Sequence, residues 1–157
     1  MELYHITKVE NAESIKKNGL ELNEGKIFLF KDIEIPYPEG LFRTDKWTNN
    51  KRLIPVSDII AKVEIHIPEY SLFKVEVDED LLHKDDDCGE KEVMDYQYYT
   101  CSPIKNVEYM GDFEVGKWYD YELLKEKYYV PAGHKVVQFK VGKINMGFGI
   151  APNGWKP

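Results

Sequence analysis

The chain has 157 residues, of which 43% are hydrophobic and 13% aromatic, and its formal net charge is −7. This length predicts one domain over residues 1–157, and the apolar content argues against disorder. An acidic chain with no Lys/Arg cluster on one periodic face disfavours a nucleic-acid partner, because phosphate contacts need a basic footprint. The two cysteines, Cys88 and Cys101, are too few and too far apart for a zinc site, and we predict no metal.

The location of the protein is predicted from what the sequence lacks. Residues 1–20 carry charges throughout and hold no apolar run, so we expect no signal peptide. No stretch reaches the length of a transmembrane helix. We therefore expect a soluble, cytoplasmic protein with no membrane partner, in which both cysteines are reduced thiols.

The first thirty residues predict a strand, a short helix and a second strand. Residues 2–7 form the first strand, residues 12–17 the helix and residues 26–30 the apolar strand that follows. Asn11 is a candidate N-cap, and Asn18-Gly19 is a typical helix end. His5 and Thr7 stand two positions apart on the first strand, so their side chains share a face.

The middle of the chain is predicted to be a long irregular segment followed by two strands. Residues 31–58 are irregular, and Trp47 within them either covers a ligand or packs on the core. Residues 59–67 alternate apolar and polar side chains, which predicts a half-buried strand, and residues 72–77 predict another. Residues 81–92 form a charged connection, in which Asp85-Asp86-Asp87 lacks the spacing of a calcium loop and is interpreted as a solvated turn.

The last third combines strands with one expected helix. Residues 95–102 predict a tyrosine-rich strand that ends before Pro103, and residues 107–110 predict a short strand. The spacing of Trp118, Tyr121 and Leu124 predicts a helix over residues 117–129. Residues 136–141 predict the final strand, before a glycine-rich tail. The whole pattern indicates an α+β fold.

Three blocks of this sequence resemble the ADP-ribosyltransferase superfamily, in the branch where a histidine opens the site. The first block is Leu3-Tyr4-His5-Ile6-Thr7 with the helix that ends at Gly19-Leu20. Strand 72–77 resembles the next block, and residues 96–107 resemble the third. The resemblance covers residues 2–110 and leaves 112–157 as a C-terminal extension that completes or flanks the sheet. It implies a split antiparallel β-sheet core with a few short helices, and NAD as substrate.

The resemblance also implies roles for individual residues. It assigns to His5 a hydrogen bond with the nicotinamide ribose, and to Ile6 and Thr7 a part in holding the carboxamide and ribose. It makes Phe28, with Phe30 as the alternate, the aromatic ring that stacks on nicotinamide, because a ring face attracts a cationic planar ligand. Trp47 is the further candidate for contact with NAD.

The sequence departs from the family pattern at the catalytic glutamate. The matching position is Gln97, which can hydrogen-bond a hydroxyl but carries no negative charge for electrostatic catalysis. Asp95 would share a strand face with Gln97, so it could substitute if the register slips. Two functions stay open. One is transfer of ADP-ribose from NAD to a macromolecule, with a protein as the expected acceptor. The other is a catalytically degenerate NAD-binding or protein-interaction module. NAD-dependent removal of an RNA 2′-phosphate is disfavoured by the acidic charge.

Overall fold

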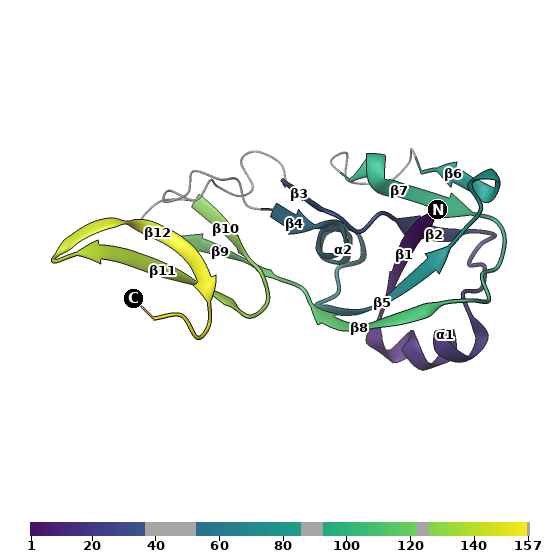
Figure 1. The fold of residues 1–157 in the computed structure, drawn as a ribbon, viewed down its shortest axis with the longest axis horizontal. Helices are drawn as coiled ribbons and strands as arrows, with labels where there is room; N and C mark the ends of the chain where they lie inside the picture. The colour runs from purple at the N-terminus through teal and green to yellow at the C-terminus, as the bar shows by residue number, and fades with distance from the viewer. Residues whose placement is uncertain (37–52, 86–92, 122–125, 157) are drawn as a thin grey trace. The chain divides into compact units, whose positions relative to one another are not determined.

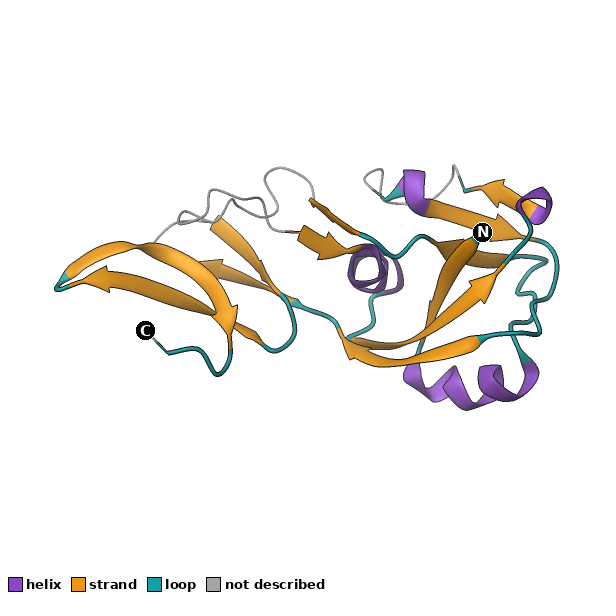
Figure 2. Ribbon diagram, in the orientation of Figure 1, coloured by secondary structure: helices purple, strands orange, loops and turns teal. Residues whose placement is uncertain are grey.

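The structure, a computed structural model, describes residues 1–36, 53–85, 93–121 and 126–156. Figure 2 shows mostly strands with a few short helices, and the strands of the largest sheet and of two further pairs run antiparallel to their partners. The α+β class predicted from the sequence is confirmed. None of the helices in these ranges is long and apolar enough to cross a membrane.

The chain forms two compact units. One comprises residues 1–34 and 55–115, and the other comprises residues 35–54 and 116–157. The first unit holds all three blocks of the family resemblance. A single domain over residues 1–157 with an extension over 112–157 stays a prediction.

The first unit is built on a six-stranded sheet with the order β6-β7-β2-β1-β5-β8 (Figure 1). Its strands are β1 (Glu2–Thr7), β2 (Ile27–Phe30), β5 (Glu69–Glu76), β6 (Leu82–Lys84), β7 (Gln97–Thr100) and β8 (Glu108–Glu114). Strands β1 and β2 pair at the single register position Tyr4↔Phe30, whereas β1 and β5 pair along six positions, from Glu2↔Glu76 to Thr7↔Ser71. In the middle of the sheet, β1 is therefore paired over a shorter length with β2 than with β5.

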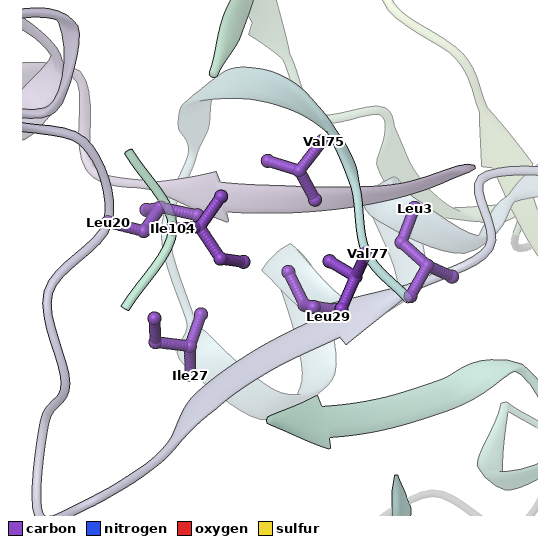
Figure 3. Packing of buried hydrophobic residues seen from close by; sticks show 7 residues of the cluster. All are labelled: Leu3, Leu20, Ile27, Leu29, Val75, Val77 and Ile104. Carbon is purple, nitrogen blue, oxygen red and sulfur yellow. The ribbon is translucent and has the colours of Figure 1, made fainter. Parts of the chain in front are cut away.

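One face of this sheet carries an apolar cluster, which Figure 3 shows as sticks. Its members come from β1, β2 and β5, from the residue that follows β5 and from the isolated bridge between residues 20 and 104, namely Leu3, Ile27, Leu29, Val75, Val77, Leu20 and Ile104. Ile15 of α1 (Ala12–Asn18) packs against them. Full burial of each such side chain contributes about 1.5–3 kcal/mol.

Helix α1 ends where a close backbone approach requires glycine. Gly19 has a φ of 76°, and a Cβ built on it would lie 2.4 Å from the Ile104 carbonyl oxygen. The next residue, Leu20, exchanges backbone hydrogen bonds with Ile104. The predicted strand–helix–strand start is confirmed. Asn11, the expected N-cap, makes no capping hydrogen bond and instead donates to Thr7 Oγ1 at 3.2 Å.

The strand predicted over residues 59–67 is wrong: this segment is helical. Helix α2 (Val56–Ile59) runs into a π-helix, η2 (Ile60–Ile65), which ends at His66 in the left-handed region. Its start is set by distant residues, because the Ile33 carbonyl and the Asp32 carboxylate accept the N–H groups of Val56 and Ser57. A short apolar run fits helix and strand alike, and these tertiary caps decide for helix.

The helix predicted over residues 117–129 is also wrong. Strands β9 (Lys117–Tyr121) and β10 (Glu126–Val130) pair there, with Tyr128 opposite Tyr119. Aromatic and β-branched residues favour strands, and this preference overrides an irregular helical spacing. The predicted final strand is β11 (His134–Val141), but β12 (Ile144–Pro152) follows it as a hairpin partner. Glycines at positions 147 and 149 concealed its pattern.

Three smaller corrections concern the other connections. Within the segment predicted to be irregular, β3 (Glu34–Pro36) and β4 (Leu53–Pro55) pair with each other. Within the charged connection predicted over residues 81–92, the edge strand β6 (Leu82–Lys84) forms, directly after the 3-10 helix η3 (Glu79–Leu81). The tyrosine-rich strand begins at Gln97, because residues Met94–Tyr96 form the 3-10 helix η4. A further 3-10 helix, η1 (Val9–Asn11), leads into α1.

Cys101 is an exposed free thiol, and Cys88 lies outside the described residues.

Candidate functional site

A cavity of about 230 Å³ is lined by residues of the six-stranded sheet and of η2. Strands β1, β2 and β7 and the helix η2 contribute to its walls. The described lining residues are His5, Ile6, Phe28, Leu29, Phe30, Ile60, Glu64, Ile65, Asp85 and Gln97. Residues far apart in the sequence, among them His5, Phe28 and Gln97, therefore meet around one cavity.

His5 is held by a backbone group of the neighbouring strand. Its Nδ1 lies 2.8 Å from the Phe28 carbonyl oxygen, a bond that only a protonated Nδ1 can donate. Burial lowers the pKa of His5, and the hydrogen bond to Phe28 opposes this shift in part. The imidazole is therefore neutral at pH 7, and Nε2 is left as a hydrogen-bond acceptor for a ligand.

Phe28 is the aromatic ring most open to a ligand. Its side chain is 52% exposed although it lies on a central strand, while Phe30 is only 3% exposed. The ring of Phe28 lies 6.5 Å from that of Tyr99, its register partner on β7. An exposed large apolar side chain at the mouth of a cavity is typical of a ligand contact.

The residue that sequence reasoning missed is Glu64. It lies on η2, and its Oε2 accepts a hydrogen bond of 2.8 Å from Gln97 Nε2. A carboxylate thus stands beside the position where the family resemblance expects one, but it comes from another element. In the predicted strand over residues 59–67 Glu64 fell on the polar face. A helix over the same residues places its carboxylate in the cavity.

Gln97 is buried, and one of its hydrogen-bond acceptors, Oε1, stays unsatisfied. Its side chain is 5% exposed, and its Oε1 has no hydrogen-bond partner among the described residues. A buried polar atom without a partner costs about 1–3 kcal/mol. Such a cost is tolerated where a ligand supplies the missing donor.

A buried polar network fixes α2, and with it Glu64, on the sheet. The Tyr70 hydroxyl of β5 lies 2.9 Å from both Ser57 Oγ and Asp58 Oδ1. All three residues are at most 6% exposed. Burial is the main cause that raises the pKa of Tyr70, so the hydroxyl stays protonated and can donate. Burial likewise raises the pKa of the Asp32 carboxyl that caps the helix start.

Two predicted site residues are absent from the described lining of this cavity, and a third cannot be placed. Asp95 is exposed in η4 and shares no strand face with Gln97, so the proposed register slip does not occur. Thr7 lies at the end of β1, where its Oγ1 accepts from Asn11. Trp47 lies outside the described residues. Ile6 and Phe30, by contrast, belong to the lining.

Asp85 is a second carboxylate that sequence reasoning did not assign to the site. It follows β6, and its backbone N–H donates to the Gln97 carbonyl at 3.1 Å. The aspartate run 85–87 was interpreted as a solvated turn, and residues 86 and 87 lie outside the described part. The pairing of β6 with β7 brings Asp85 to the cavity, which no local sequence signal indicates.

The polar side chains around the cavity share one chemical property. His5 Nε2, Gln97 Oε1 and the two carboxylates are hydrogen-bond acceptors, and the described lining holds no Lys or Arg. The cavity therefore suits a ligand that brings hydrogen-bond donors and positive charge. Within the described residues, no group of three or more His, Cys, Asp or Glu side chains could hold a metal ion.

Comparisons of the chain with protein-family models, with curated proteins and with solved structures found no match.

Proposed function

We propose that the protein is an NAD-dependent ADP-ribosyltransferase that binds the nicotinamide–ribose end of NAD in this cavity and transfers ADP-ribose to a macromolecular acceptor. The supporting observation is that His5 and Phe28 line one cavity together with a carboxylate, that of Glu64. The family resemblance expects these three kinds of group. The formal net charge of −7 favours a protein acceptor over nucleic acid, because phosphate contacts need a basic footprint.

Each residue has a role in this reaction. His5 Nε2 accepts a hydrogen bond from a ribose hydroxyl, and Phe28 stacks on the cationic nicotinamide ring. The bond between ribose C1′ and the nicotinamide nitrogen breaks, and its electron pair leaves with neutral nicotinamide. Positive charge then develops on the ribose, where the Glu64 carboxylate stabilises it. The acceptor nucleophile, or water, bonds to C1′ and releases its proton to solvent.

The binding step is tested by calorimetric titration of the full chain with NAD. We expect His5→Ala to weaken binding at least about tenfold, because it removes a hydrogen bond to ligand inside a cavity. His134→Ala is the matched control, since its Nδ1 also bonds a backbone carbonyl, that of Ala132 at 3.0 Å, on a hairpin of the other unit. Absence of binding at millimolar NAD would refute the proposal.

The chemical step is tested with Glu64→Gln. The amide keeps an acceptor for Gln97 Nε2 but lacks the charge, so we expect NAD affinity to change little. Turnover of NAD to nicotinamide should fall by about 10²–10³, the usual cost of removing one electrostatic group. Nicotinamide release, measured by chromatography, provides the rate.

The alternative is a catalytically degenerate NAD-binding or protein-interaction module on the same scaffold. The observation that favours it is the uncharged Gln97 at the position where the family resemblance expects the glutamate. This alternative predicts NAD binding without nicotinamide release in the wild type, and no effect of Glu64→Gln on any rate.

A further inference from the structure

Asp85 occupies a defined place at the cavity although the proposed reaction assigns it no step. Its backbone N–H bonds to the Gln97 carbonyl at 3.1 Å, so the main chain at position 85 is fixed beside β7. The residue is half-buried and belongs to the cavity lining. Glu64 reaches the same Gln97 through the side-chain hydrogen bond of 2.8 Å. Two carboxylate residues thus flank one buried glutamine.

The charges and hydrogen-bonding groups of the lining point to one class of ligand. Among the described residues it holds the carboxylates of Glu64 and Asp85 and no Lys or Arg, and His5 contributes no positive charge while it is neutral. Independently, the buried Gln97 Oε1 has no hydrogen-bond partner among the described residues, and a ligand can supply the missing hydrogen-bond donor. Opposite charges a few ångströms apart at partly buried sites attract strongly, whereas a neutral ring gains nothing from a carboxylate.

We propose that Asp85 is a specificity-determining residue, which selects the cationic, oxidised nicotinamide ring over the neutral, reduced ring. This inference rests on the proposed function, since it presumes that a nicotinamide dinucleotide enters the cavity. The Phe28 ring acts in the same direction, because an aromatic face attracts a cation more than a neutral ring. Selection of this kind keeps reduced dinucleotide, which cannot expel neutral nicotinamide, from occupying the site.

The test compares the affinities of the full chain for NAD and for NADH at one fixed ionic strength. We expect NADH to bind at least about tenfold more weakly than NAD. Asp85→Asn should weaken NAD binding about tenfold and leave NADH binding within about twofold, so the affinity ratio falls toward one. Asp80→Asn is the matched control, because it removes the same charge from an exposed position in η3 of the same unit. It should leave the ratio unchanged.

Each other outcome has a distinct meaning. If NADH binds as tightly as NAD, or if Asp85→Asn leaves the ratio unchanged, the inference is overturned and the proposed function stands. If the wild type binds neither dinucleotide, the proposed function fails and the inference with it. Should Asp85→Asn fail to fold, Asp85→Ser removes the same carboxylate with another small polar side chain. An unchanged ratio in that variant would also overturn selection by the charge of the cavity.

Discussion

The two faces of the six-stranded sheet are formed by alternate residues of the same strands, yet they are packed in different ways. The face of Leu3 and Val75 is closed by an apolar cluster without polar partners to satisfy. The face of Ile6 and Gln97 meets α2 and η2 through hydrogen bonds between buried polar groups, and a cavity remains between them. The first face carries a buried apolar cluster, whereas the buried side chains of the second include Gln97, which lines the cavity with Glu64.

This difference separates stability from function within one unit. Burial of apolar surface supplies most of the folding free energy and needs no particular geometry. Buried polar groups add little net stability when all are paired, and they cost free energy when one is not. Gln97 Oε1 is such a group, and we expect its cost to be repaid when a ligand binds.

The largest expected effect is on the apolar face. Leu3→Ala removes a fully buried side chain and should lower the free energy of unfolding by about 2–5 kcal/mol, through lost burial and a cavity that cannot collapse. Urea unfolding followed by circular dichroism measures this change. Leu22→Ala, at a side chain 40% exposed, should stay within about 0.5 kcal/mol. A loss below 1 kcal/mol in Leu3→Ala would contradict the stability role of the cluster.

A smaller loss of stability is expected when the hydrogen-bond network of Tyr70, Ser57 and Asp58 is broken. Tyr70→Phe leaves Ser57 and Asp58 without their shared hydroxyl and should cost about 1–3 kcal/mol. It should also weaken NAD binding, because α2 carries the segment with Glu64. Tyr4→Phe is the control, since its hydroxyl bonds Glu2 at an exposed site. Equal costs in the two variants would show that the network does not fix α2.

The third prediction concerns a pH-dependent change at Gln97. Gln97→Glu sets two carboxyl groups at hydrogen-bond distance, so the pKa of one must rise. A carboxyl group whose pKa is raised in the folded state stabilises the folded protein at pH values below its unfolded pKa of about 4.3. This stabilisation is lost as the pH rises through the folded pKa. The variant should therefore be less stable than wild type by about 1–3 kcal/mol at pH 7 and recover toward pH 4. Gln138→Glu, at an exposed position of β11, should show no such recovery.

The smallest effect is expected from His5. Burial lowers its pKa in the folded protein, so its contribution to stability is complete above the unfolded value of about 6.5. As the pH falls through the lowered folded pKa, this contribution is lost, with a slope of at most about 1.4 kcal/mol per pH unit. Wild type should thus lose stability relative to His5→Gln between pH 7 and pH 5. Parallel curves for the two proteins would contradict a buried neutral imidazole.

Local patterns in the sequence determined the elements that rest on near neighbours. The strand with His5, helix α1 with its end at Gly19, and the apolar strand with Phe28 all follow from period, capping and glycine chemistry. The α+β class was therefore predictable, whereas the grouping of His5, Phe28 and Gln97 around one cavity was an expectation from the family resemblance. Their meeting needs only that the first two strands and β7 are neighbours.

Tertiary structure alone decided the parts that depend on distant partners. Asp32 and Tyr70 fix residues 56–65 as a helix where the alternation of apolar residues predicts a strand. In a helix the side chains repeat with a different period than in a strand, and this places Glu64 at the cavity. The pairing of β6 with β7 brings Asp85 to the same cavity. A short apolar run fits either conformation by itself. The capping groups and the buried hydroxyl that select one lie 12 to 25 residues away in the chain.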